Sequence, residues 1–495
     1  MSLTKIPQLS KTKFSAGLQC LKRLYLESYS RDLTDPITAS QQALFDAGTA
    51  VGELAREGYP GGHLIAELYY NHSEAVTSTR NAFADRTIPA IYEAAFTFER
   101  VRIRIDILIR NDGDSFDLVE VKSTTRVKDE HIPDAAIQLY VAEGSGLKIR
   151  KVSLLHIDSS YVYEGGPYDL AQLFHAEDIT DQTRSFLSST FPGALSRMWA
   201  VLAQNEVPGI DIGPHCTAPY VCSLYAYCHQ GQPQHDIEQL PRASQPLLSD
   251  LKNIGIQDIG DIPSDFPGLS AAQRRVRDSV VSGRPYVGAG LAVALGEVAY
   301  PVHFLDFETF NPALPLYPGT RPYQVIPFQW SLHVQDSQGN LNHDSFLHTG
   351  TGDPRDAFSA ALIEAIGPVG TIIVYGNFEE TRLKELAATF PRYSDRLMSL
   401  VDRLLDLLDV VREHYYHPGF HGSYSIKSVL PALVPELGYE DLSIQDGSTA
   451  SVAFTRIIDP GTDDVERVRI RGELADYCKK DTEGMVRIFE ALISH

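Results

Sequence analysis

Apolar residues recur at helical spacing near the start of the chain. In LSKTKFSAGLQCLKRLYLESY, the side chains Phe14, Leu18, Leu21 and Tyr25 repeat every three or four positions. This period predicts one amphipathic helix, and Cys20 should lie on it.

The pattern then changes to the alternation of a β-sheet. Residues 91–109 alternate apolar and polar positions and predict a hairpin, and DSFDLVEVKSTT after them predicts a further strand. HIPDAAIQLYVAEGSG predicts a helix that ends at glycine, and KVSLLHI predicts one more strand. This order of elements is typical of an α/β domain.

A linker-like stretch at 230–240 is followed by short helical patterns that alternate with Gly-Ile turns. This segment is similar to small helix-hairpin-helix modules that grip a phosphate backbone. A helical spacer with its own small core is the simpler interpretation. That core would consist of Ile254, Ile256, Ile259 and Ile262.

A second α/β pattern begins near residue 301. The apolar strand VHFLDFETF carries two acids, and the strand TIIVYGNF, the helix EETRLKELAATF and a long C-terminal helix follow it. These elements predict a mixed sheet flanked by helices. We therefore expect three segments, which are 1–235, 236–296 and 297–495.

Composition narrows the classes of protein. The 495 residues carry a formal net charge of −21, which argues against a protein that coats nucleic acid and leaves room only for a local basic groove. The chain has no run of about 18 uncharged apolar residues, and its first residues lack the apolar region of a signal peptide. We expect a cytoplasmic protein with no membrane partner.

The first candidate chemistry lies on the predicted strands of the N-terminal half. Asp106 lies in RIRIDILIR, and Glu120 and Lys122 are two residues apart on the next strand, so they share a face. Phosphodiester hydrolysis needs carboxylates that converge on a divalent cation. We expect Asp106, Glu120 and the carbonyl of Val121 to bind Mg²⁺ or Mn²⁺, and Lys122 to orient water or stabilise charge.

Two further features surround this pattern. Gln138 and Tyr140, on the helix that follows, are candidates to contact substrate or to brace the lysine. Cations gather in the same stretch of an otherwise acidic chain; they are Arg100, Arg102, Arg104, Arg126 and Lys128.

The cysteines bracket this pattern. One lies near the start and three lie together much later, and in a reducing compartment this spacing favours metal ligation over disulfides. The four are Cys20, Cys216, Cys222 and Cys228. The fifth, Cys478, is left without a role.

With this nesting, residues 9–230 resemble the RecB-like branch of the PD-(D/E)xK nucleases, of the CRISPR-associated iron-sulfur exonuclease type. The resemblance implies a restriction-endonuclease-like core and a [4Fe-4S] cluster on the four cysteines that clamps the two ends of the domain together. Zn²⁺ is the alternative metal, and buried free thiols are the alternative to any metal. Where the family often has a histidine ligand, this chain has Gly52, and Glu93 is a candidate to complete the metal shell.

A second set of acids lies in the C-terminal half. Asp306 and Glu308 share one strand face, as two divalent ions about 4 Å apart would require. Glu379 follows a buried-looking strand, and Tyr477 and Asp481 are four residues apart on a helix, where they share a face.

In this order, the acids resemble the tyrosine-containing branch of the DEDD 3′–5′ exonucleases, which have an RNase H-like fold. The resemblance implies that Asp306, Glu308, Glu379 and Asp481 bind metal and that Tyr477 orients the attacking water. Asp402 is the alternative third acid, because the family has aspartate where this chain has Glu379. Substrate phosphate is a possible contact for the residues between these acids, His417, His421, Tyr424 and Lys427.

The order of the two domains resembles an uncharacterised bacterial group of two-nuclease fusions. We expect a metal-dependent DNA nuclease that acts on single-stranded or end-exposed DNA in repair, recombination or defence. The alternatives are a nucleic-acid-binding scaffold with decayed sites and an RNA 3′-end processing enzyme. No G-x-x-x-x-G-K-[ST] motif is present, so any unwinding would need a helicase partner.

Overall fold

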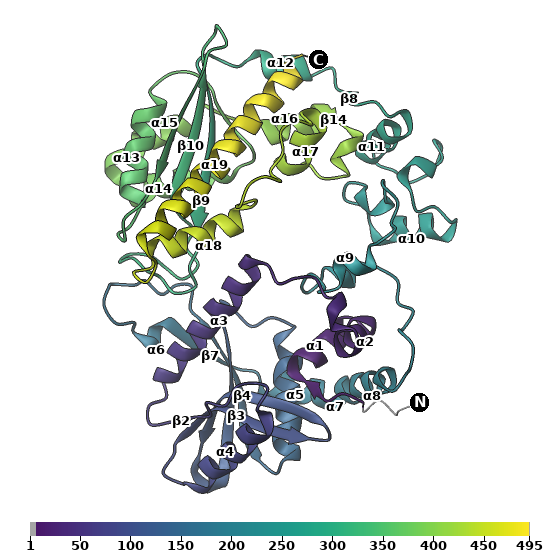
Figure 1. Ribbon diagram of the computed structural model, residues 1–495, viewed down its shortest axis with the longest axis vertical. Coiled ribbons are helices and arrows are strands. Elements are labelled where there is room, and N and C mark those ends of the chain that lie inside the picture. The colour runs from purple at the N-terminus through teal and green to yellow at the C-terminus, as the bar shows by residue number, and fades with distance from the viewer. Residues whose placement is uncertain (1–5, 495) are drawn as a thin grey trace. The chain divides into compact units, whose positions relative to one another are not determined.

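The computed structural model describes residues 6–494. The chain forms two compact units (Figure 1). The N-terminal unit comprises the chain up to Gln230 together with Pro312–Gln324, and the C-terminal unit comprises Gly231–Asn311 and the chain from Val325 onward. The segment that we expected to stand apart, 236–296, therefore falls within the C-terminal unit, and a short stretch of the expected third segment folds with the first.

The N-terminal unit is an α/β structure built on one mixed sheet. Its strands are β1 (Leu9–Ser10), β2 (His63–Leu64), β3 (Ala90–Phe98), β4 (Val101–Arg110), β5 (Ser115–Lys122), β6 (Lys148–Ile157) and β7 (Phe174–Asp178). The order across the sheet is β2-β3-β4-β5-β6-β7, and β1 pairs with β4. The pairs β3–β4 and β4–β5 are antiparallel, whereas β5–β6 is parallel. The predicted hairpin, the next strand, the helix and the last strand are confirmed.

Helices complete this unit. They are α1 (Lys11–Gln19), α2 (Leu21–Tyr29), α3 (Ala39–Glu57), α4 (His72–Ala84), α5 (His131–Gly144), α6 (Leu170–Leu173), α7 (Thr180–Ser189), α8 (Phe191–Leu202) and α9 (Tyr225–Cys228). The helix α5 is apolar on most of its surface because it packs on β3, β4 and β6 on one side and on α7 and α1 elsewhere.

The first predicted helix is broken at Cys20. This residue has extended backbone angles, with φ −159° and ψ 123°, and separates α1 from α2. Its N–H donates to the carbonyl of Ala16, which closes α1, and its own carbonyl accepts from the N–H of Leu24, which opens α2. Apolar spacing runs through both helices, so the period alone missed the break.

The C-terminal unit is also α/β, with a separate five-stranded sheet. Its strands in order across the sheet are β11 (Leu341–Leu347), β10 (Ile326–Gln335), β9 (Val302–Phe310), β12 (Ile372–Val374) and β13 (Leu404–Asp406). β9 is antiparallel to β10 and parallel to β12. A two-stranded pair, β8 (Tyr286–Val287) with β14 (Tyr415–Tyr416), lies outside this sheet.

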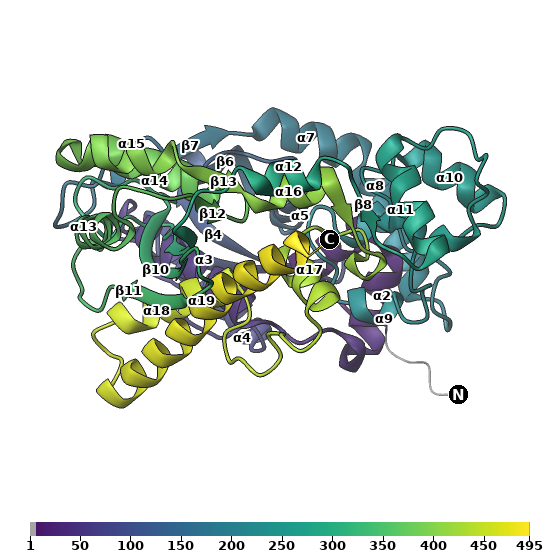
Figure 2. The same cartoon turned by 90° about the horizontal axis from the view of Figure 1, so that it is seen from above.

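The helices of this unit cover both faces of the sheet. They are α10 (Gln245–Asn253), α11 (Ala271–Ser282), α12 (Leu291–Gly296), α13 (Arg355–Ile366), α14 (Phe378–Thr389), α15 (Ser394–Val401), α16 (Leu407–His414), α17 (Ile426–Leu433), α18 (Gly447–Ile458) and α19 (Asp464–Ile493). The long helix α19 packs along β9 and β10 and also contacts α17 and α18, as both views show in yellow (Figures 1 and 2).

The two faces of β9 have different neighbours. Leu305 and Phe307 join the core formed with α13, α14 and α15. On the other face, Phe304 packs on Phe489 of α19 and Phe310 packs on Phe454 of α18. The residues between these two phenylalanines on the same face therefore point toward α18 and α19.

Two smaller points concern the sequence patterns. Of the isoleucines expected as the core of the helical segment, Ile256, Ile259 and Ile262 are buried, but Ile254 is 60 % exposed because it caps the C-terminus of α10. Within residues 6–494, no helix combines the length and the apolar character that crossing a membrane requires.

Candidate metal sites

The first site lies where β4 and β5 separate. The ladder between them runs from the pair Arg110–Phe116 to the pair Ile107–Val119. Past it, the carboxylate of Asp106 takes the place of a strand partner and accepts a hydrogen bond from the N–H of Val121 at 2.7 Å. Because the N–H and the carbonyl of one strand residue point to the same edge, we expect the Val121 carbonyl to face Asp106 as well.

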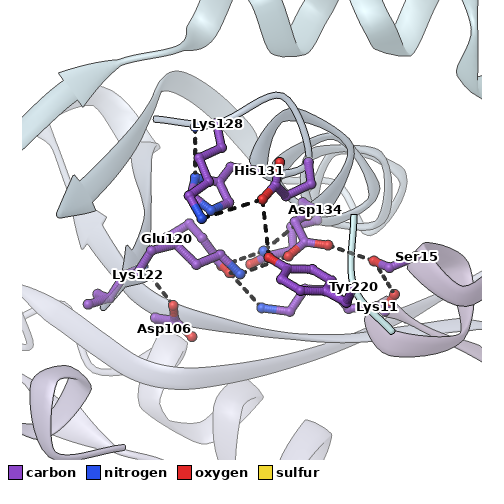
Figure 3. A network of polar contacts seen from close by, with 12 residues as sticks. Lys11, Ser15, Asp106, Glu120, Lys122, Lys128, His131, Asp134 and Tyr220 are labelled. Carbon is purple, nitrogen blue, oxygen red and sulfur yellow. Dashed lines mark hydrogen bonds and ion pairs between the residues drawn. The ribbon is translucent and has the colours of Figure 1, made fainter. Parts of the chain in front are cut away.

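Glu120 is the buried centre of this site (Figure 3). Lys122 Nζ lies 2.9 Å from Glu120 Oε1, which confirms that the two residues share a strand face. Lys11 Nζ of α1 donates to the same oxygen at 2.7 Å, and Gln138 Nε2 of α5 donates to Oε2 at 2.5 Å. Asp134, one turn before Gln138, accepts from Lys122 at 2.7 Å and from a serine of α1.

The lysines of this site outweigh the effect of burial at Glu120 but not at Asp106. Burial and the neighbouring Glu120 raise the pKa of Asp106 to about 7. Burial would also raise the pKa of Glu120, but Lys11 and Lys122 outweigh it and hold that pKa well below the usual range. The N-terminal unit thus brings three carboxylates and two partly exposed ammonium groups together around the fully buried Glu120.

Lys11 is a site residue that sequence reasoning missed. It is the first residue of α1, directly after the N-cap Ser10, and lies far from the strand motif in sequence. The sequence position of Lys11 gives no signal for its role in this site, because a lysine in the first helical turn usually points to solvent. Only the packing of α1 against α5 brings its ammonium group to Glu120.

We expect Lys11→Met to destabilise the metal-free N-terminal unit by about 2–3 kcal/mol, because it leaves a buried carboxylate with one counter-ion fewer. The Lys11 side chain is 28 % exposed, which keeps the effect below that of a fully buried pair. Urea unfolding in EDTA measures it. Lys13→Met, two residues away, is the matched control, and an equal loss in both variants would contradict this role of Lys11.

Glu93 lies opposite Asp106 on the neighbouring strand. The β3–β4 register places it between the pairs Tyr92–Ile107 and Ala94–Ile105, and its φ of +56° marks a local distortion of the strand. Its negative charge contributes to the raised pKa of Asp106. Arg56 of α3 forms an ion pair with it at 2.8 Å, so Glu93 already has a cationic partner.

Gly52, in the position where the resembled family often has histidine, lies on α3 one turn before Arg56. Among the described residues, a Cβ at Gly52 would meet no atom within 4 Å. The position is therefore open, and no side chain of its own replaces the missing ligand.

Gln138 and Tyr140 do not act together as expected. Residues two apart on a helix point about 200° apart, so Gln138 faces Glu120 while Tyr140 faces away. The Tyr140 hydroxyl donates to Glu99, and its ring packs on Phe98 and Phe191. Gln138 braces the glutamate, not Lys122.

The arginines of the stretch also have other partners. Arg100 donates to the carbonyl of Ile6 and lies 5.0 Å from the centre of the Trp199 ring. Arg104 donates to backbone carbonyls of Ile65 and Leu68. These two cations hold loops in place, and the cations of the site itself are Lys11 and Lys122. Of the other three predicted cations, Lys128 forms a longer ion pair with a nearby acid, Glu130.

The four cysteines come together despite the long sequence between them. Gln19 donates to the carbonyls of His215 and Tyr220, both at 2.7 Å, which holds the late cysteine loop against the end of α1. The Cys222 N–H donates to the Cys216 carbonyl at 2.8 Å. Burial raises the pKa of the Cys222 thiol, and the neighbouring Cys20 and Cys228 raise it further.

The four thiols do not form a ready-made site for a single ion. Within the described chain, no three of their sulfur atoms lie within 4.8 Å of one another. Tetrahedral zinc, with Zn–S bonds of about 2.3 Å, requires sulfur atoms about 3.8 Å apart. A single zinc ion would therefore need the thiols to move closer together.

The second site lies on the face of β9 that points toward α18 and α19. Asp306 and Glu308 lie there between Phe304 and Phe310. Asp481 and Tyr477 reach the same place from α19, one turn apart as predicted. These residues line a cavity of about 280 Å³, together with Tyr375, Ile426, Lys427 and Gly447.

Glu379 completes the acidic group. It is the second residue of α14, directly after β12, and only 3 % of its surface is exposed. Its charge raises the pKa values of both Asp306 and Glu308. Its Oε2 is buried and has no hydrogen-bond partner among residues 6–494, which is costly for a carboxylate unless a cation or a proton satisfies it.

Three residues of this site were missed from the sequence. Tyr439 donates to Asp481 Oδ1 at 2.6 Å. The backbone of Gly447, at the start of α18, approaches Glu308 so closely that a Cβ would lie 3.6 Å from its Oε2. Cys478 points its thiol at Asp306. Isolated tyrosine, glycine and cysteine residues carry no periodic signal, so only the packing of α18 and α19 on β9 reveals them.

Lys427 is the cation of the cavity. It lies at the start of α17, donates to the carbonyl of Gln445 and stands over the rings of Tyr439 and Tyr477, 5.6 and 5.4 Å from their centres. Its charge lowers the pKa values of Glu308 and Asp481 and so partly offsets the effect of burial.

The carboxylates of this site resist ionisation. Burial, followed by the charge of Asp481, raises the pKa values of Asp306 and Glu308 well above the usual range. Burial raises the pKa of Glu379 to about 8 and that of Asp481 to about 6. Such crowding of acids in a buried cavity is stable at neutral pH only with protons or a cation between them.

We expect the metal-free protein to lose stability as pH rises through about 6–8. The pKa values of Asp481, Asp106 and Glu379, about 6, 7 and 8 when folded, lie above their unfolded values. The folded state therefore binds more protons than the unfolded state in this range, and raising the pH costs stability. Thermal unfolding in EDTA across this range measures the effect.

Glu379→Gln removes one of these acids and should make the fall with pH shallower. Mg²⁺ or Mn²⁺ should restore stability most at the alkaline end, where protons compete least. A melting temperature that stays constant or rises from pH 6 to 8 in EDTA would contradict this electrostatic account.

The remaining predicted residues lie elsewhere. Asp402 is exposed at the end of α15. His417 accepts from Gly419 within a turn, and His421 stacks on His235 and contacts the carbonyl of Gln234. The carbonyl of Tyr424 accepts from Tyr375, which lines the cavity. The histidines thus shape loops, and Lys427 alone of this segment's candidates lines the cavity with its own side chain.

Comparisons with known proteins find similarity over part of the chain. A family described as a domain of unknown function (DUF2779) matches residues 303–425, which include Asp306, Glu308 and Glu379. Uncharacterized protein MG366 of Mycoplasma genitalium is 26 % identical over 206 residues, covering 37 % of this chain and 31 % of that protein. Uncharacterized protein UU173 of Ureaplasma parvum is 25 % identical over 208 residues, covering 37 % and 30 %.

The MG366 homolog of Mycoplasma pneumoniae is 25 % identical over 207 residues, covering 37 % of this chain and 31 % of that protein. The chain thus spans about a third of the length of these curated relatives. The similarity that these comparisons establish is to uncharacterized mycoplasmal proteins and, around the strand of Asp306, to a domain of unknown function.

Proposed function

We propose that the protein is a metal-dependent nuclease with two hydrolytic sites. The observation that carries this proposal is the second site, where three carboxylates from β9 and α19 line one cavity together with a lysine and two tyrosines, and the charge of the buried Glu379 of α14 acts on two of them. Acids that are gathered at such electrostatic cost are typical of a site for divalent cations.

In the second site, Asp306, Glu308, Glu379 and Asp481 would hold the cations, which supply Lewis-acid activation of water and neutralise the scissile phosphate. Tyr439 fixes the Asp481 carboxylate by its hydrogen bond. Tyr477 faces the cavity, where its hydroxyl can orient the attacking water. Lys427 gives this acidic site a positive charge that attracts a phosphodiester.

The strand order of the C-terminal unit supports this assignment. The sheet runs β11-β10-β9-β12-β13, with the first three strands antiparallel and the last two parallel to β9. This arrangement is the one expected of an RNase H-like fold, and its first strand carries Asp306 and Glu308. We propose that this unit trims the 3′ ends of DNA or RNA.

In the first site, Asp106, Glu120 and the Val121 carbonyl would hold a divalent cation, and Lys122 would stabilise charge on the phosphate. The succession β3-β4-β5-α5-β6, with the acids on the second and third of these strands, supports a PD-(D/E)xK-type core. We propose that this unit cuts single-stranded or end-exposed DNA.

For the cysteines we propose a [4Fe-4S] cluster with a structural role. Cys20, Cys216, Cys222 and Cys228 would hold it, and the way the late cysteine loop is held against the end of α1 supports a group shared by all four thiols. Such a group ties the junction of α1 and α2 to the end of the N-terminal unit and closes a very long loop of chain.

Two observations favour a second candidate function for the first site. Lys11 already satisfies Glu120, and Gly52 offers no ligand where the family often has histidine. A first unit that binds nucleic acid without cutting it is therefore the alternative, with hydrolysis confined to the second site.

Digestion of labelled single-stranded DNA and RNA in Mn²⁺ tests these proposals, with wild type, Lys122→Ala and Asp306→Ala. We expect each variant to lose a different part of the products, 3′-end trimming with Asp306→Ala and the remaining cleavage with Lys122→Ala. An unchanged product pattern in Lys122→Ala would indicate an inactive first site. If wild type shows no metal-dependent cleavage of either substrate, the nuclease proposal fails.

A further inference from the structure

Cys478, which the sequence left without a role, lies within the second acidic site. One oxygen of Asp306, one oxygen of Glu308 and Sγ of Cys478 all lie within 4.8 Å of one another. The thiol lies 3.6 Å from Asp306 Oδ2 and is completely buried. Two hard oxygen donors and one soft sulfur donor thus face a common point.

The position of Cys478 on α19 directs its thiol toward β9. Cys478 lies three residues before Asp481 on α19, so both side chains lie on the face of that helix that packs on β9. Asp306 and Glu308 point from β9 toward the same helix. Any shift of one residue along α19 would turn the thiol away.

A second observation indicates that a cation belongs here. Glu379 is only 3 % exposed, and its Oε2 has no hydrogen-bond partner in the described part of the chain. Its charge acts on both Asp306 and Glu308, so this unsatisfied oxygen belongs to the same group of acids. A cation among these donors would remove the cost of burying it.

We propose that Cys478 is a metal ligand of the second site, so that this site prefers a thiophilic divalent ion such as Zn²⁺ or Co²⁺ over Mg²⁺. This inference rests on the proposed metal binding by Asp306 and Glu308. Thiolates select softer ions, whereas sites of carboxylates alone suit Mg²⁺ and Mn²⁺. On binding, the Cys478 thiol releases its proton to solvent, and the thiolate sulfur donates an electron pair to the ion.

This ligand changes what the site is expected to do. A site that takes its ion through Asp306, Glu308 and Cys478 would hold it far more tightly than the weak, exchangeable Mg²⁺ of a site built only from carboxylates.

Cobalt spectroscopy of the full-length, anaerobically purified protein tests the inference. Co²⁺ bound to a thiolate shows a charge-transfer band in the near ultraviolet that oxygen ligands do not produce. We compare wild type with Cys478→Ser, so that the difference spectrum cancels any signal from the four N-terminal cysteines. Asp306→Asn is the control that should abolish binding at this site.

We expect the charge-transfer band in the difference spectrum, and a loss of Zn²⁺ affinity of about tenfold or more in Cys478→Ser with little change for Mg²⁺. Cys478→Ala, with far-ultraviolet circular dichroism of both variants, shows whether the fold is intact and must give the same result.

Two results would overturn the inference in distinguishable ways. If wild type and Cys478→Ser bind Co²⁺ with the same spectrum, the thiol only donates a hydrogen bond to Asp306, and the proposed metal site stands. If Asp306→Asn changes the binding of none of Co²⁺, Zn²⁺ or Mg²⁺, the metal site itself is absent, and the proposed function of this unit fails with it.

Discussion

Glu379→Gln should reduce metal-dependent 3′-end trimming by about 100-fold or more, while Asp402→Asn should leave it unchanged. Glu379 contributes its charge to the acids of the second site and has a buried, unsatisfied oxygen. Asp402 is exposed at the end of α15. Removing a negative charge that holds the cations lowers transition-state stabilisation directly, and an isosteric amide does so without leaving a cavity.

The measurement is the rate of nucleotide release from the 3′ end at saturating Mn²⁺. Both substitutions replace one acid by its amide, so they are matched in size and charge. A large loss in Asp402→Asn together with a small one in Glu379→Gln would reverse the assignment and make Asp402 the third acid. Equal rates in wild type and both variants would show that neither Glu379 nor Asp402 contributes to catalysis.

The proposed cluster predicts that the anaerobically purified protein is brown, and Cys222→Ser should remove this colour and destabilise the N-terminal unit by about 3–5 kcal/mol. The physical reason is loop closure, because a group held by Cys20 and Cys222 restrains a very long stretch of the unfolded chain. Urea unfolding measures this loss of stability. Limited proteolysis at each urea concentration monitors the N-terminal unit, because the cleavage fragments are assigned to it by their sequence.

Cys478→Ser is the matched control for this prediction. It removes the one cysteine that lies outside the cluster of Cys20, Cys216, Cys222 and Cys228, so the visible absorption of the protein should stay. A colourless wild type that contains stoichiometric zinc would contradict the iron-sulfur assignment. Loss of colour in Cys478→Ser as well would show that the absorption is not specific to the four N-terminal cysteines.

Sequence reasoning worked best where the signal is periodic. The alternation in residues 91–109 indicated the hairpin β3–β4, and the period of two placed Glu120 beside Lys122. The period of 3.6 placed Tyr477 and Asp481 on one face of α19. In each case neighbours within one element determine the result, and local geometry is enough to predict it.

The same reasoning failed where a single residue departs from its element. Cys20 interrupts a continuous apolar pattern because its extended backbone closes one helix and opens the next. Gln138 and Tyr140 were grouped by proximity in sequence, but a helix turns them to different sides. Ile254 looked like a core residue and is exposed at the end of α10.

By itself, the sequence determined the α/β class of both halves, the strand and helix positions of the acids, and the pairing of Glu120 with Lys122, because each of these follows from periodicity within one element. Only the tertiary structure decided that Lys11 reaches Glu120, that Tyr439 holds Asp481 and that Cys478 faces Asp306. These contacts join elements far apart in the chain. Their geometry depends on how whole helices pack on a sheet, and no local pattern encodes that packing.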